Sequence, residues 1–75
     1  MPASEGEVYN ALRKIIANKE AKALNYAVNY ARAGLSMKGE ELRIQCLYVL
    51  NNMTHWRGNE AKESRNILKN YAGIK

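Results

Sequence analysis

Apolar side chains in this chain recur at the spacing of an amphipathic α-helix, and this periodicity limits the possible fold more than any other feature. Val8, Leu12, Ile15 and Ile16 stand at positions i, i+4, i+7 and i+8, which is the pattern of one buried helical stripe. Other valines and isoleucines are also spaced as in helices, and no apolar–polar alternation persists between two turn signals. The sequence therefore predicts an all-α fold without β-strands.

Turn signals divide the chain into four expected helices, at approximately residues 5–17, 19–33, 40–55 and 60–72. Ser4 and Glu7 form the sequence pattern of a capping box at the start of the first helix. We expect Asn18 to cap the second helix and Gly34 to end it in the left-handed conformation. The linker-like stretch 36–39 then separates two helix–turn–helix units. The prediction is one domain over residues 1–75, a small four-helix bundle made of two consecutive helical hairpins.

The third expected helix has an unusually wide apolar surface. Leu42, Cys46 and Leu50 lie along its buried side, and Ile44 and Tyr48 broaden the apolar surface further around the helix. A helix that is apolar around much of its circumference is normally surrounded by other helices. We therefore expect the third helix to be the centre of the bundle.

The chain contains few residues that could reinforce a small core. With 75 residues, it buries only roughly 60% of the surface that its unfolded form exposes. One cysteine excludes an internal disulfide, and one cysteine with one histidine gives too few ligands for a zinc site of that type. Self-association is the remaining source of extra stability, so a homodimer is one hypothesis.

Catalytic chemistry has weak support in the sequence. Cys46 and His55 are nine residues apart, so on one continuous helix they lie on opposite sides and cannot form a catalytic pair. Glu40 and Glu41 are expected in the first turn of the third helix and Glu60 and Glu63 in the first turn of the fourth, where negative charge complements the helix dipole. We expect a protein that is not an enzyme and that needs no metal and no cofactor.

Basic residues of the fourth expected helix suggest one binding role. Lys62, Arg65 and Lys69 recur at i, i+3 and i+7, with Asn66 beside them and Arg57 just before the helix. Lysine and arginine contact phosphates, and arginine or asparagine reads base edges. The net charge of +5 favours an acidic partner in the same way. A DNA- or RNA-binding protein is therefore one hypothesis, and an ordinary solvated helix surface is the alternative.

Aromatic residues suggest a different role. Tyr26 and Tyr30 stand four residues apart on the second expected helix, slightly off its apolar stripe, and Trp56 follows the third. Such residues pack at the edge of small cores, and they are also common at the centres of protein interfaces. We therefore rank core packing first, a protein interface second and nucleic-acid stacking third for these side chains.

The sequence also predicts the environment of the protein. No run approaches the ~20 apolar residues that cross a bilayer, and residues 1–5 do not match a signal peptide. A single cysteine is typical of a reducing compartment, so we expect a cytoplasmic protein without a membrane partner. The leading hypothesis is a non-enzymatic interaction module that self-associates or docks to a protein partner, and the alternative is the small basic nucleic-acid-binding protein.

Overall fold

The structure, a computed structural model, describes residues 3–74 of the chain. Its helices are α1 (Glu5–Ala17), α2 (Asn25–Gly34), α3 (Gly39–Asn51) and α4 (Asn59–Ala72), and a short 3₁₀ helix, η1 (Lys22–Leu24), precedes α2. Within residues 3–74 there is no β-strand. The predicted all-α fold is confirmed.

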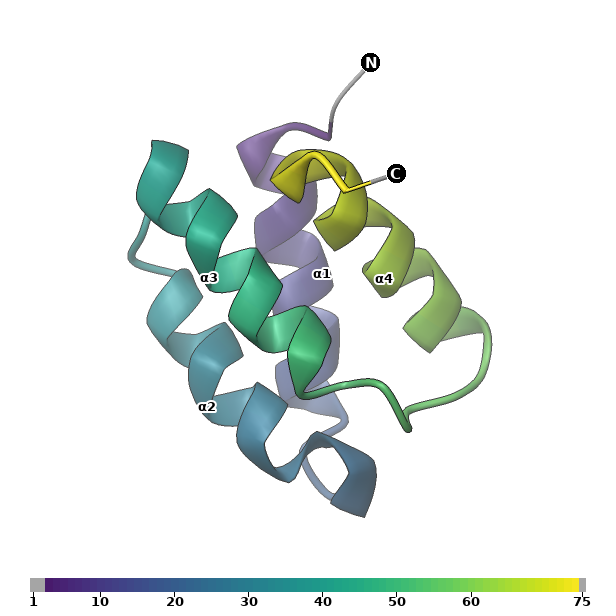
Figure 1. Cartoon of the computed structure of the whole chain (residues 1–75). Coiled ribbons are helices and arrows are strands. Elements are labelled where there is room, and N and C mark those ends of the chain that lie inside the picture. Colours follow the sequence, from purple (N-terminus) through teal and green to yellow (C-terminus); the bar gives the residue numbers. More distant parts are fainter. Residues whose placement is uncertain (1–2, 75) are drawn as a thin grey trace.

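The four helices form a ring in which each helix packs against two others. α1 contacts α2 and α4, and α3 contacts the same two helices. In Figure 1 the chain runs down α1, up α2, down α3 and up α4, so the beginning of α1 and the end of α4 lie at the same end of the bundle. This arrangement confirms the predicted four-helix bundle built from two consecutive hairpins.

All four helices contribute to one apolar core. The stripe predicted for the first helix is present, since Val8, Leu12 and Ile15 are fully buried and Ile16 packs against the core from its edge. The other large side chains that are fully buried come from η1, α3, α4 and the α3–α4 loop, namely Leu24, Leu42, Val49, Met53 and Leu68. The core therefore extends along the inner side of every helix.

The predicted capping box begins α1. The Glu7 backbone N–H donates a hydrogen bond of 3.2 Å to Ser4 Oγ, and the Ser4 backbone N–H donates one of 3.1 Å to the Glu7 carboxylate. Both bonds satisfy amides that the helix itself leaves unpaired. The first helix consequently covers the predicted residues 5–17.

The second helix begins later than the predicted residue 19. Asn18 does not cap it, because Asn18 is the C-cap of α1 and its Nδ2 donates a 2.8 Å hydrogen bond to the Lys14 carbonyl oxygen. The following residues turn the chain, and η1 then brings Leu24 fully into the core before α2 starts at Asn25. The asparagine side chain completes the preceding helix instead of starting the next one.

The third helix ends at Asn51 and not at the predicted residue 55. Asn52 is its C-cap, and the Asn52 Nδ2 donates a 2.8 Å hydrogen bond to the Tyr48 carbonyl oxygen. After this bend the chain turns Met53 and Trp56 into the core. The predicted last turn of the helix, residues 52–55, therefore does not form, because the chain leaves the helix to bury Met53 and Trp56.

Gly34 has a packing role in place of the predicted left-handed cap. Positive φ angles occur at Gly39, Gly58 and Gly73, whereas Gly34 is the last residue of α2. A Cβ atom on Gly34 would lie 2.9 Å from Leu12 Cδ1 and 3.4 Å from Gln45 Cγ. Glycine therefore allows α2 to approach α1 and α3 closely at this point.

The expectation of a central third helix is wrong. Among the described residues, α3 packs mainly against α2 and α4, just as α1 packs mainly against the same two helices. Ile44 and Tyr48, which broaden its apolar surface, are exposed to solvent. Because α3 buries one side, the excess apolar side chains must lie on its outer surface.

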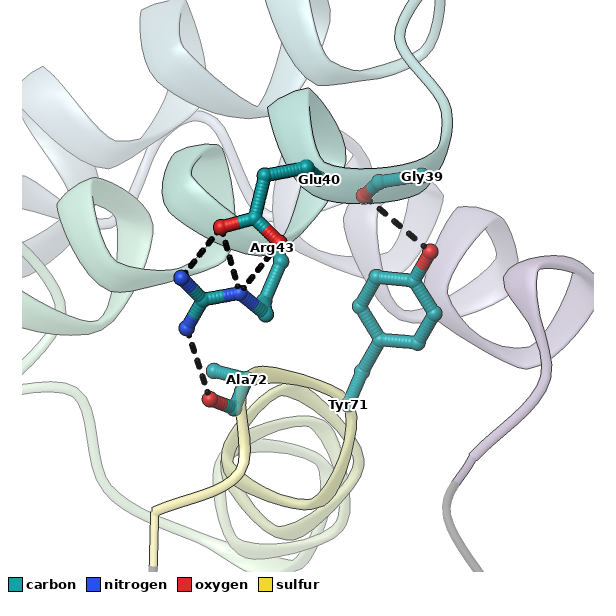
Figure 2. A network of polar contacts seen from close by, with 5 residues as sticks. All are labelled: Gly39, Glu40, Arg43, Tyr71 and Ala72. Atoms are coloured by element: carbon teal, nitrogen blue, oxygen red, sulfur yellow. Dashed lines mark hydrogen bonds and ion pairs between the residues drawn. The ribbon is translucent and has the colours of Figure 1, made fainter.

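Polar contacts connect the helices at the end of the bundle where α1 begins and α4 ends. The Glu5 carboxylate accepts a 2.6 Å hydrogen bond from the Gly39 backbone N–H, and the Tyr71 hydroxyl lies 3.1 Å from the same oxygen. The Tyr71 hydroxyl also lies 3.4 Å from the Gly39 carbonyl oxygen (Figure 2). These contacts connect the beginnings of α1 and α3 to the end of α4.

A second set of contacts lies beside them. Arg43 forms an ion pair with Glu40 one turn earlier on α3, and its Nη1 donates a 3.3 Å hydrogen bond to the Ala72 carbonyl oxygen (Figure 2). The hydrogen bond from Arg43 lowers the pKa of the Glu40 carboxyl. Arg43 thus satisfies a carbonyl at the C-terminal end of α4.

Candidate functional site

Two neighbouring helices contain long stretches without a charged residue. Residues 23–31 include most of α2, and residues 44–56 include most of α3 and part of the following loop; neither stretch contains Asp, Glu, Lys or Arg. α2 and α3 are antiparallel and packed against each other (Figure 1). The uncharged stretches therefore meet on one side of a protein whose overall charge is +5.

Large apolar side chains are exposed on this side. Tyr26 is 72% exposed and Tyr30 39% on α2, and Ile44 is 40% exposed and Tyr48 50% on α3. Each pair is four residues apart, so its members are neighbours on the same side of their helix. We call these four residues the tyrosine face.

Direct contacts connect the two halves of the tyrosine face. The rings of Tyr30 and Tyr48 stack with 5.8 Å between their centroids and 24° between their planes. Beside them, the buried Gln45 side chain donates a 2.8 Å hydrogen bond from Nε2 to the Tyr30 carbonyl oxygen. The backbone at Tyr30 is therefore held in place by a hydrogen bond from a buried side chain.

Small residues allow the two helices to come close together below the face. Ala27, Ala31 and Gly34 line the buried side of α2, and short side chains permit a close approach between helix axes. At Gly34 the two helices are close, since a Cβ atom there would lie 3.4 Å from Gln45 Cγ and 3.8 Å from Leu42 Cδ1 of α3.

Part of this surface is predictable from the sequence. Tyr26 and Tyr30 are interface candidates there, whereas Ile44 and Tyr48 were expected to broaden the apolar surface of a central helix. The signal that would have found them is the width of the apolar arc on the third helix, which exceeds what one helix of a four-helix ring can bury. Trp56, also named for an interface, is only 8% exposed and belongs to the core.

The residues predicted to bind nucleic acid divide into a set of exposed side chains and Arg65, which binds a loop. Lys62, Asn66 and Lys69 are exposed on the outer side of α4, and Arg57 is exposed in the loop before it. Asn66 and Lys69 also line a shallow, open depression together with Asn70 and Ile74.

Arg65 differs from the other basic residues because it holds the α3–α4 loop. Its Nη2 donates hydrogen bonds of 2.9 Å to the Trp56 carbonyl oxygen and 3.3 Å to the Met53 carbonyl oxygen. Two backbone acceptors are thereby satisfied by one charged donor. Arg65 is consequently part of the structure that positions the loop.

On the side of α4 that faces α1, two glutamates of α4 lie next to residues of α1 and its C-cap and reduce the positive charge there. The Lys14 ammonium lies 3.3 Å from the Glu63 carboxylate, and the Asn18 Nδ2 lies 3.4 Å from the Glu60 carboxylate. The exposed basic surface is therefore limited to the outer side of the helix.

Cys46 and His55 lie in different environments. Cys46 is fully buried, and burial raises the pKa of its thiol to about 11. His55 lies in the exposed loop after the end of α3. Because thiol reactivity needs a thiolate accessible to the reagent, Cys46 has the character of a core side chain.

Two further findings concern the described part of the chain. Residues 3–74 contain no group of three or more His, Cys, Asp or Glu side chains placed to hold a metal ion. None of the helices within this range combines the length and the apolar character that a bilayer crossing requires.

A comparison of the chain with protein-family models, curated proteins and solved structures finds no match.

Proposed function

We propose that this chain is a non-enzymatic protein-interaction module that binds its partner through the tyrosine face. The observation that carries the proposal is an uncharged surface with three exposed tyrosines in a protein with 19 charged residues. The centres of protein interfaces are depleted of charge and enriched in tyrosine. Exposed, clustered apolar side chains in a small protein are typical of an interaction site.

The architecture of the face supports the same proposal. The Tyr30–Tyr48 stack and the Gln45 hydrogen bond hold two of the tyrosines before any partner arrives. An interface that is already ordered loses less conformational entropy on binding. Cys46 has no exposed surface, which supports a role in packing and not in covalent catalysis.

The proposal is tested with two single-residue variants of the full chain. Tyr26→Lys places a charge in the tyrosine face, and Lys62→Glu changes a charge on α4, outside the face. A partner is first identified by co-purification and then produced in pure form. Calorimetry with the two pure components should show affinity reduced by about tenfold or more for Tyr26→Lys, and unchanged affinity for Lys62→Glu.

A pure protein that binds no partner through this face, neither a second copy nor another protein, contradicts the proposal. So does binding that Lys62→Glu abolishes while Tyr26→Lys leaves it intact. Circular dichroism of both variants verifies that the helices are retained.

Nucleic-acid binding through α4 is the second candidate function. It is favoured by Lys62, Asn66 and Lys69, which share the exposed outer side of one helix. The test is fluorescence anisotropy with labelled duplex DNA and single-stranded RNA at several salt concentrations. The hypothesis expects affinity to fall steeply with salt and to be lost in the double variant Lys62→Glu/Lys69→Glu, which keeps Arg65 and therefore the loop that Arg65 holds.

A further inference from the structure

We infer that the tyrosine face pairs with the same face of a second copy of this chain and forms a symmetric homodimer. The inference rests on the function proposed above and names the partner. Three observations support it: the hydrogen-bonding character of the face, the distribution of charge around it and the area that one side of the bundle offers.

The first observation concerns the exposed polar side chains on the uncharged stretches of α2 and α3. Within α2 and α3 every one is a tyrosine or an asparagine, namely Asn25, Tyr26, Asn29, Tyr30, Tyr48 and Asn51, and the loop part of the second stretch adds Thr54 and His55. A tyrosine hydroxyl and an asparagine carboxamide each contain both a donor and an acceptor. In a two-fold symmetric interface the same surface meets itself, so groups of this kind can pair with their own copies.

The second observation concerns charge. Two copies that each carry +5 repel one another unless their charged residues lie away from the contact. Lys22 and Arg32 bound the uncharged stretch of α2, and Arg43 and Arg57 bound that of α3. An uncharged surface offers no attraction to an acidic or basic partner, whereas a second uncharged surface matches it without burying an unpaired charge.

The third observation is the available area. An interface of standard size takes about 800 Å² from each partner, which is about one sixth of the 4890 Å² surface of this molecule. The ring of four helices has four outward sides, each formed by two adjacent helices. The α2–α3 side is therefore large enough for one such interface.

The test is sedimentation equilibrium of the pure full chain between about 1 μM and about 1 mM. The wild-type protein should form a dimer and no larger species, because a symmetric interface closes on itself. Tyr26→Lys should weaken dimerisation by about tenfold or more, since it brings two charges into an apolar contact. Ala17→Lys, which adds the same charge to the exposed C-terminal end of α1, should leave it unchanged.

Two further measurements complete the experiment. Dimerisation should be at least as strong in ~500 mM salt as in ~50 mM salt, because screening reduces the repulsion between the two copies. Tyr48→Lys provides a second disruption from α3, and circular dichroism reports whether each variant keeps its helices. If Tyr48→Lys unfolds because it loses the Tyr30 stack, the more exposed Tyr26 still decides the test.

The possible results separate the two proposals. A wild-type chain that stays monomeric throughout, or a dimer that neither Tyr26→Lys nor Tyr48→Lys weakens, overturns the homodimer. A monomer that binds a different purified protein in a Tyr26-dependent way overturns the homodimer while leaving the proposed function intact. Concentration-dependent filaments in place of a dimer also overturn the symmetric pairing.

Discussion

The carboxylate of Glu5 accepts a hydrogen bond from the backbone N–H of Gly39, although 34 residues separate them in the chain. Gly39 is the first residue of α3 and has a φ of +61°. Its predecessor, Lys38, makes no side-chain cap to the helix. A glutamate from α1 therefore takes the place of the usual N-terminal cap of α3, and its negative charge interacts favourably with the positive end of the α3 dipole.

Removal of this acid should destabilise the bundle. We expect Glu5→Ala to lower the free energy of unfolding by about 1–2 kcal/mol, because the Gly39 amide and the Tyr71 hydroxyl both lose a charged acceptor. Urea denaturation followed by circular dichroism measures the change. Glu20→Ala, in the exposed turn after α1, serves as the control and should change stability by less than about 0.5 kcal/mol. Equal effects of the two substitutions would contradict the capping role of Glu5.

Tyr71 should make stability depend on pH in alkaline solution. Burial and then the hydrogen bond to Glu5 raise the pKa of its hydroxyl above the ordinary value of 10.0. The protonated form is therefore favoured in the folded protein, and the stabilisation is complete below pH 10 and is lost as the pH rises through the raised pKa. Unfolding free energies measured across this range should fall more steeply for the wild type than for Tyr71→Phe. Parallel curves for the two proteins would refute the prediction.

Gly34 and Gly6 should respond in opposite directions to the same substitution. Gly34→Ala places a Cβ atom 2.9 Å from the fully buried Leu12 Cδ1, so we expect a net loss of about 1 kcal/mol or more from overpacking. Gly6→Ala lies on the exposed first turn of α1, with only Ser4 Oγ near the new atom, at 3.8 Å. It should stabilise the helix by about 0.5–1 kcal/mol. Thermal unfolding of the two variants measures both effects, and a stabilised Gly34→Ala would show that the contact has room to relax.

Arg65 and Lys62 should differ although both are basic residues of α4. Arg65→Ala should cost about 1–2 kcal/mol, because the Trp56 and Met53 carbonyl groups lose their donor. Lys62→Ala, on the exposed side, should change stability by less than about 0.5 kcal/mol. Denaturant unfolding with Trp56 fluorescence as the probe follows the loop directly. If Arg65→Ala unfolds at the same denaturant concentration as the wild type, Arg65 does not hold the loop.

Several features of the fold follow from the sequence alone, because their causes are local. The stripe of Val8, Leu12 and Ile15 determines which side of α1 is buried, and Ser4 with Glu7 determines where α1 begins. The helical spacing of apolar residues in four segments, with a linker at the midpoint, is enough to predict two hairpins. Tyr26 and Tyr30 were also identified as candidates, since they lie beside the apolar stripe of their helix.

Other features depend on contacts between residues far apart in the chain. The side chains of Asn18 and Asn52 can bond to either of two neighbouring segments, and the need to bury Leu24, Met53 and Trp56 decides between them. The end of α3 and the late start of α2 are therefore set by core packing.

The tyrosine face is also a result of tertiary structure. The sequence by itself determined that α3 has an unusually wide apolar surface, but not which of its residues are covered. The ring of four helices covers one side of α3 and leaves Ile44 and Tyr48 beside Tyr30 at the surface. In the same way, the spacing of Arg65 predicted that it belongs to a basic stripe with Lys62 and Lys69. Its two carbonyl partners exist only because the α3–α4 loop folds next to it. Local periodicity therefore determined the helices, and the packing between them decided which side chains remain available to a partner.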